Sequence, residues 1–272
     1  MFRTMSKVNV GQLDFKPVAA YFLAVAILFA GTLLVQGFNR RAAVLALANT
    51  FSNTVMIGIA LVGLMYGPAG LVTLLTLVSV HALVLLTSAT VVLELAVARE
   101  QKQGAPGAVA AAPRQALATV LMALKNSLLH PVPLPIMAGL LFAQTGWVIP
   151  GVIDKPLEML ALAFGPLALV LVGVTLANTP VGPHWRPALA LAGIKNLAHP
   201  LLVALLCRLL GVGGLPMTVM VVAAALPIGA NVFLFSQRYE VAEELVTASV
   251  VVSTALALLS LTLVFTLLPY LG

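Results

Sequence analysis

Two short polar segments interrupt long apolar stretches of this 272-residue chain, and both carry side chains that could bind a solute. The first runs from Ala48 to Thr54 and the second from Leu226 to Asn231. An amide or hydroxyl group left without a partner outside water costs roughly 2–7 kcal/mol. Within a bilayer such groups must therefore face protein or trapped water. Two interrupted apolar segments in corresponding positions predict the binding site of a transporter.

The first interruption supplies amide and hydroxyl groups from Asn49, Ser52, Asn53 and Thr54. If helix persists through it, Asn49 and Asn53 share a face because they are four residues apart. A half-helix N-terminus carries about +0.5 charge and free N–H groups, which suit a carboxylate. We therefore predict that these four residues bind substrate. The alternative is ordinary inter-helix hydrogen bonding, which is common for Asn and Ser in membrane bundles.

The second interruption combines a helix breaker, a small residue and an amide. Pro227 removes a backbone donor and frees a carbonyl four residues earlier. Gly229 permits close backbone approach, and Asn231 can bind substrate. We predict that all three belong to the substrate site, with a geometric role for Pro227. The alternative is a structural kink in which Asn231 satisfies the freed groups.

Three further polar residues lie inside apolar spans. Lys195 is about 12 Å into its span at 1.5 Å per residue, where it could pair with a substrate carboxylate or snorkel to the surface. His81 and His199 could relay protons, although a lone intramembrane His also serves packing. No Asp/Glu pair lies at mid-span, which disfavours a carboxylate-built ion site. Coupling to H⁺ or Na⁺ through other groups stays open.

No motif indicates a metal site, a cofactor or enzymatic activity. The sequence has neither a Gly-rich phosphate loop nor a His/Cys/Glu cluster with metal-ligand spacing. An intramembrane enzyme is a remote alternative that would have to use His81, His199 and Ser253, whose spacing forms no known signature. The net charge of +6 is spread over loops without a dense basic tract, so no nucleic-acid partner is expected.

The elements that position these residues are transmembrane helices. The chain is 61% hydrophobic and 8% charged, against about 25% charged residues in soluble domains. Apolar segments of about 20 residues cross a bilayer as helices. We predict an all-α polytopic membrane protein with eight spans, at residues 17–36, 42–65, 70–97, 118–143, 155–177, 187–210, 216–238 and 243–269.

One long connection, residues 98–117, divides the spans into three and five. It is rich in Ala, Gly and Pro and carries charged residues, so it is expected to be a flexible linker. The predicted units are thus a partial first repeat (1–97), a cytoplasmic linker (98–117) and a complete second repeat (118–272). This orientation places seven Lys or Arg residues inside and four outside. Both termini are then external, in the plasma membrane.

The order of the spans indicates an inverted-topology repeat. Each broken span follows one apolar helix and precedes a helix with a Ser in a Val-rich turn, Ser79 or Ser253. The broken spans are five crossings apart and therefore antiparallel. The second half has five spans and the first only three. We expect an N-terminally shortened version of a ten-helix protein; the alternative is a natural eight-helix variant.

Both interruptions resemble the auxin efflux carrier family, in particular its bacterial members, often labelled malonate or dicarboxylate transporters. The resembling runs are 49–58 and 225–233, together with Ser236 to Tyr239, Gly165 to Leu169 with Gly173 and Leu176, and Lys195 with His199-Pro200. The resemblance implies two inverted five-helix repeats with an X-shaped crossing of the fourth and ninth helices. The chain departs from that pattern because it lacks the first two helices. Those helices complete one repeat, so their absence weighs against transport by the chain alone.

These observations favour a secondary transporter or facilitator of small organic anions, such as malonate-like carboxylates, that works by alternating access. The residues leave substrate identity, direction, coupling ion and oligomeric state open, with a homodimer among the alternatives. The alternative function is a non-transporting remnant, or a membrane subunit whose partner supplies the missing helices.

Overall fold

The computed structural model describes residues 1–8, 13–104, 121, 133–178 and 182–271. Within these ranges the chain is helical, which confirms the all-α membrane fold. Four helical stretches are long and apolar enough to cross a membrane: Lys16–Gln36, Thr54–Glu100, Gly182–Leu209 and Glu243–Leu268. The stretches Leu134–Gln144 and Gly214–Ala225 are shorter but also apolar.

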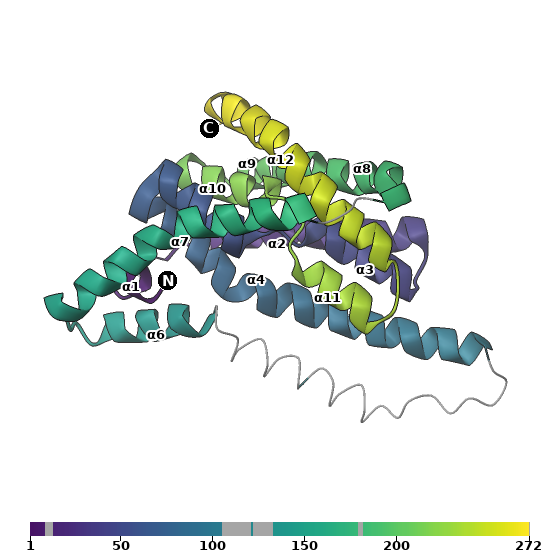
Figure 1. Cartoon of the computed structure of the whole chain (residues 1–272), viewed down its shortest axis with the longest axis horizontal. Helices are drawn as coiled ribbons and strands as arrows, with labels where there is room; N and C mark the ends of the chain where they lie inside the picture. Colours follow the sequence, from purple (N-terminus) through teal and green to yellow (C-terminus); the bar gives the residue numbers. More distant parts are fainter. Residues whose placement is uncertain (9–12, 105–120, 122–132, 179–181, 272) are drawn as a thin grey trace.

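The helix α10 (Gly214–Ala225) is largely buried in the core, and Figure 1 shows it beside α9 (His199–Leu209). It packs against α9, α4 (Ile59–Gly104) and α12 (Glu243–Leu271). Its residues from Val219 to Ala225 are at most 2% exposed. Val and Ala side chains are short, so neighbouring backbones approach closely, as membrane helix packing requires. The helix end that carries the second interruption is thereby held in the core.

The two predicted interruptions are real breaks. The helix α3 (Arg40–Thr50) ends at an extended Phe51, and a π-helical turn, η2 (Thr54–Gly58), leads into α4. Likewise α10 ends before an extended Leu226, and α11 (Asn231–Arg238) begins after it. The antiparallel pair α2 (Lys16–Gln36) and α3 pack together, and α2 also packs on α9. We call residues 51–53 and 226–230 the crossover.

The expected span 187–210 is helical throughout but carries a local distortion. It consists of α8 (Trp185–Gly193), the π-helical turn η4 (Ile194–Ala198) and α9. Pro200 has no N–H to donate to the preceding turn, and the π-helical turn widens the helix just before it. The N–H of His199 donates to the carbonyl of Ile194 instead. This turn carries Lys195.

Two boundaries differ from the expectation. The spans expected at 42–65 and 70–97 are joined within α4 by a kink at Gly67, whose φ of 59° is accessible to glycine. Helix α4 also extends to Gly104, into the expected linker 98–117. Arg40 holds this end by donating through Nε to Glu100 at 2.6 Å, and Arg99 lies over the ring of Phe38. The remainder of the linker, and most of the span expected at 118–143, lie outside the described residues.

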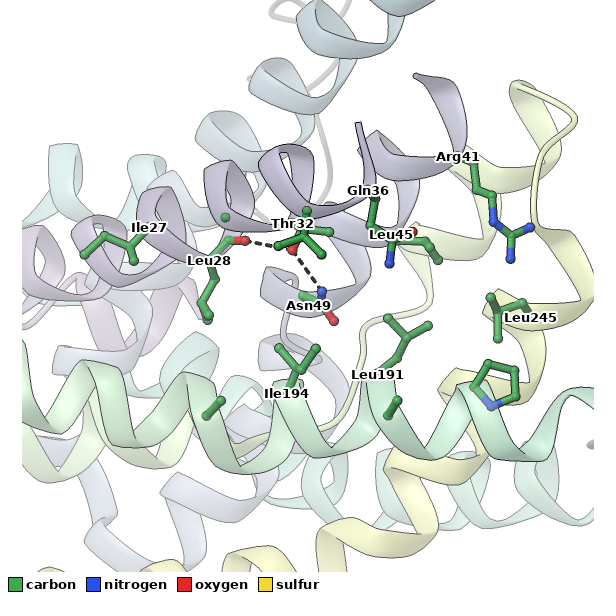
Figure 2. A pocket seen from close by; sticks show the side chains of 15 residues that line it. Ile27, Leu28, Thr32, Gln36, Arg41, Leu45, Asn49, Leu191, Ile194 and Leu245 are labelled. Carbon is green, nitrogen blue, oxygen red and sulfur yellow. Dashed lines mark hydrogen bonds between the residues drawn. The ribbon is translucent and has the colours of Figure 1, made fainter. Parts of the chain in front are cut away.

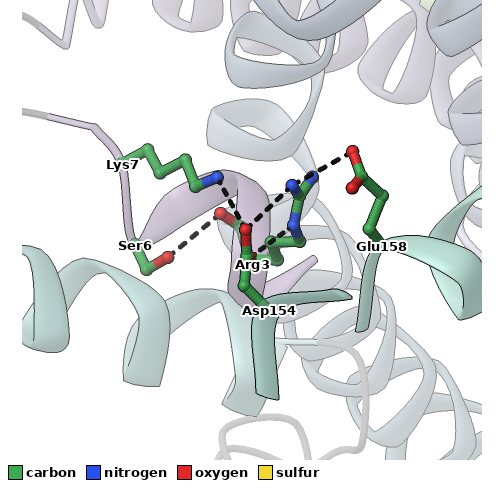
Figure 3. A network of polar contacts seen from close by, with 5 residues as sticks. All are labelled: Arg3, Ser6, Lys7, Asp154 and Glu158. Carbon is green, nitrogen blue, oxygen red and sulfur yellow. Dashed lines mark hydrogen bonds and ion pairs between the residues drawn. The ribbon is translucent and has the colours of Figure 1, made fainter. Parts of the chain in front are cut away.

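The N-terminal helix α1 (Phe2–Met5) is tied to α7 (Gly151–Asn178) and packs on α6 (Pro133–Gln144). Figure 3 shows the ion pairs: Arg3 Nε lies 2.6 Å from Asp154 Oδ1, and Arg3 Nη2 lies 3.1 Å from Glu158 Oε1. Lys7 Nζ lies 3.4 Å from Asp154 Oδ2. The hydrogen bond from Arg3, with the charges of Arg3 and Lys7, lowers the pKa of Asp154 below its ordinary value.

This network predicts a pH-dependent contribution to stability. A carboxyl group whose pKa is depressed on folding stabilises the folded state above its ordinary pKa, and the contribution disappears as pH falls through the folded-state pKa. Replacing Asp154 by Asn should therefore lower the unfolding temperature near neutral pH, and the difference from the unsubstituted chain should vanish in strong acid. Thermal unfolding in nanodiscs at a series of pH values measures this. A difference that is constant with pH would contradict the assignment.

Candidate crossover site

The two breaks pair with each other through their backbones. Ser52 and Ile228 form an antiparallel β-bridge. The N–H of Asn53 donates to the carbonyl of Pro227 at 2.9 Å, and the N–H of Gly229 donates to the carbonyl of Phe51 at 2.9 Å. Each break thus satisfies two backbone groups of the other, in keeping with the need of non-helical backbone inside a membrane for protein partners. The pairing brings residues far apart in the sequence to one point.

The second break is also anchored by α12 and η4. The N–H of Ile228 donates to Ser253 Oγ at 3.1 Å, and Asn196 Nδ2 donates to the carbonyl of Ser253 at 2.8 Å. All three residues are at most 1% exposed. Ser253 was singled out as a marker of the repeat and as part of the remote enzyme alternative, and Asn196 was not predicted at all. The sequence did contain a signal for Asn196, because this amide stands next to Lys195 within an apolar span.

Lys195 neither snorkels to the surface nor lines the crossover cavity. It is fully buried, and its Nζ donates to the carbonyls of Ala224 at 2.6 Å and Leu226 at 2.7 Å. These carbonyls stand at the C-terminal end of α10, where the helix dipole is negative and cations are favoured. The structure shows no ion pair for Lys195 in the described ranges. Its Nζ donors therefore satisfy two carbonyls at the end of a broken helix.

The first break is held by a hydroxyl-imidazole chain. Tyr21 of α2 places its hydroxyl 2.9 Å from Ser52 Oγ and 3.2 Å from His81 Nε2. All three side chains are at most 1% exposed. Sequence reasoning missed Tyr21, because only its contacts with Ser52 and His81 distinguish it from an ordinary aromatic residue. His199 contacts the ring of Tyr21, with centroids 5.2 Å apart, but neither of its ring nitrogens has a hydrogen-bond partner in the described residues.

A cavity of about 190 Å³ lies beside the crossover, and we call it the crossover cavity. It contains most of the predicted site, being lined by Phe51, Ser52, Asn53, Thr54, Val55, Met56, Val78, His81, Ala82, Gly229, Ala230 and Asn231. Its lining comes from both breaks and from α4. The structure thus places Ser52, Asn53, Thr54, Gly229 and Asn231 around one cavity, with His81 among them.

Two helix N-termini begin at the crossover cavity. Asn53 caps η2 by accepting the N–H of Met56 at its Oδ1, 3.3 Å away, a role for which Asn is strongly preferred. Among the described residues, the N–H groups of Val55, Ala230 and Asn231 have no acceptor. The amide nitrogen of Asn53 and the carboxamide of Asn231 also have no protein partner there. The cavity is therefore rich in donors at the positive ends of two helices.

Pro227 and Asn49 lie apart from this cavity. Pro227 contributes its carbonyl to the backbone pairing, which agrees with a geometric role. Asn49 and Asn53 do not share a face, because α3 ends at Thr50 and Asn53 is not helical. Asn49 Nδ2 donates instead to Thr32 Oγ1 at 3.0 Å, and Asn49 lines a second cavity between α2, α3 and α8 (Figure 2).

Comparison with known proteins agrees with this architecture. A protein of Rhizobium meliloti (strain 1021) named "Putative malonate transporter" is 32% identical to this chain over 135 residues. That match covers 49% of this chain and 42% of the relative, so the chain aligns with less than half of the relative's length. The family described as "Membrane transport protein" matches residues 3–265. Because this match covers nearly all of the sequence, the chain belongs to the membrane transport protein family.

Proposed function

We propose that this protein is a secondary transporter or facilitator of small organic anions and that the crossover cavity binds the substrate. The observation that carries the proposal is the convergence of two half-helix N-termini, with unpaired N–H donors, on one cavity. Such ends bind anions without further charged residues. Family membership supports transport rather than intramembrane catalysis.

The charges at the crossover favour an anionic substrate. The cavity lies at the N-terminal ends of η2 and α11, while the Lys195 amino group lies at the C-terminal end of α10. Each charge would thus lie at the helix end of opposite sign. A carboxylate could accept hydrogen bonds from the backbone N–H groups of Ala230 and Asn231 and from the side chain of Asn53. The relative named for malonate supports a small dicarboxylate as the first substrate to test.

Alternating access would come from movement of the crossover against the helices that cover it. Coupling to H⁺ would use His81, because it lines the cavity and contacts Tyr21. His199 would be a weaker second step, since only a ring contact to Tyr21 connects it. The setting we propose is the bacterial inner membrane with both termini outside. A partner-dependent subunit is the competing reading, and uptake by the purified chain alone would eliminate it.

Replacing Asn53 or Asn231 by Ala should strongly weaken transport. Each variant removes a donor to a charged ligand, a hydrogen bond that contributes about 1.5–3 kcal/mol, so the apparent affinity should fall at least about tenfold. Radiolabelled malonate uptake into proteoliposomes measures this. The matched control is Asn178→Ala, because Asn178 is exposed at the end of α7 and its amide bonds, within the part of the chain that the structure describes, only to the carbonyl of Val174.

The uptake series has a clear contrary outcome. If both cavity variants transport like the Asn178→Ala control, the crossover cavity is not the substrate site. If the unsubstituted chain is folded in the proteoliposomes but takes up no carboxylate, the proposed activity itself fails. Circular dichroism on the same preparations separates loss of folding from loss of binding.

A further inference from the structure

The second cavity has a composition unlike that of the crossover cavity. It measures about 540 Å³ and runs between α2, α3 and α8, with η4 and Leu245 of α12 completing its lining. Its walls are almost entirely apolar, with Leu28, Leu45 and Ile194 among them (Figure 2). Gln36 and Arg41, both exposed, stand at one end. We call it the α2–α3–α8 cavity.

Asn49 places one unpaired acceptor in this cavity. The residue is 2% exposed, and its Oδ1 is buried without a hydrogen-bond partner. The orientation of the amide follows from its neighbour: Thr32 Oγ1 donates to the carbonyl of Leu28 at 2.8 Å, so it can only accept from Asn49. The amide nitrogen is therefore used, and the oxygen points into the cavity (Figure 2). Such an acceptor would repel a carboxylate and requires a donor.

Arg41 supplies the complementary charge at the other end. Arg41, Leu45 and Asn49 line the cavity at four-residue spacing along α3, so they lie on one face. Eight residues of helix separate Arg41 from Asn49, which is about 12 Å at 1.5 Å per residue. Arg41 forms no ion pair with any described residue. A cation, an apolar wall and a deep acceptor thus follow one another along a single groove.

We propose that the α2–α3–α8 cavity binds an amphipathic carboxylate that carries a hydrogen-bond donor, such as a hydroxyl, about 12 Å from its acid group. The carboxylate lies at Arg41, the apolar body contacts Leu28, Leu45 and Ile194, and the hydroxyl donates to Asn49 Oδ1. The site is separate from the crossover cavity and takes a longer and more apolar ligand. Its occupant would contact the last turn of α3, directly before the crossover.

The test compares two probe acids on the full chain in nanodiscs. Isothermal titration should show ω-hydroxydecanoate, whose extended chain is about as long as the groove, binding about fivefold more tightly than decanoate, which lacks the donor. Asn49→Ala should make the two affinities equal by weakening only the hydroxylated acid. Arg41→Gln should weaken both acids by the same factor.

A cavity-filling variant keeps the test independent of Asn49. A Cβ added at Gly31 meets nothing within 4 Å, and Gly31 lines the cavity. Gly31→Leu should therefore fold normally and lose binding of both acids. Gly173→Leu is the matched control, since Gly173 also has open space around it but lies on α7.

Three results would overturn the proposal. The first is equal affinity of the unsubstituted chain for the two acids, and the second is undiminished binding to Gly31→Leu. The third is native mass spectrometry that shows a phospholipid retained by the unsubstituted chain and lost from Gly31→Leu, because a lipid chain would then be the occupant. Malonate uptake does not enter this test, so it stands apart from the proposed transport function.

Discussion

Replacing Lys195 by Met should abolish transport and lower the free energy of unfolding by about 2–4 kcal/mol. The substitution keeps most of the apolar stem but removes both hydrogen bonds to the carbonyls of Ala224 and Leu226. Each buried carbonyl left without a donor costs about 1–3 kcal/mol. Removing a buried polar group from an apolar interior offsets part of this cost. Transport should suffer most, because Leu226 is the first residue of the second break.

Thermal unfolding in nanodiscs and malonate uptake measure the two effects on the same preparation. Lys155→Met is the matched control, since Lys155 is exposed on α7 and far from α10 in the sequence. We expect that control to behave like the unsubstituted chain in both assays. A Lys195→Met variant with unchanged unfolding temperature and unchanged uptake would show that the two hydrogen bonds do not maintain the crossover.

The breaks themselves could be predicted from sequence because they depend on local chemistry. Pro227 and Gly229 oppose helix wherever they occur, and an Asn preceding a new helical turn is a common cap, as Asn53 proves to be. The approximate ends of α2, α7 and α12 follow equally from composition and length. These properties need no knowledge of which segments touch.

The partners across the crossover could not be predicted in this way. The pairing of Ser52 with Ile228 depends on where two helices stop and on their relative depth. An error of one turn in the end of α3 is enough to misplace Asn49, which was grouped with Asn53 on the assumption that helix continued. Lys195 shows the same limit. Its depth in the span could be calculated from the sequence, but its hydrogen-bond partners depend on where α10 ends in space. Counting residues does not give that position.

Gly229→Ala should disrupt the crossover more selectively than any change of a polar side chain. A Cβ at this position would lie 2.7 Å from Phe51 Cδ1 and 3.2 Å from the carbonyl oxygen of Ser52. Phe51 is 5% exposed, so its ring has little room to turn away. The two backbone segments must then separate, and the hydrogen bond from the N–H of Gly229 to the carbonyl of Phe51 lengthens or breaks. We expect loss of malonate uptake and about 1–3 kcal/mol of destabilisation from overpacking.

The contrast with another glycine isolates this effect. Gly193→Ala adds the same methyl group to α8, where nothing lies within 4 Å, and should retain uptake with equal or slightly higher stability. Because the nearest atoms to the added methyl belong to the Phe51 ring, the double variant Phe51→Leu/Gly229→Ala should recover part of the lost stability. A double-mutant cycle measures that coupling. Zero coupling between the two positions would mean that the methyl group is accommodated elsewhere and that close approach at Gly229 does not determine the geometry of the crossover.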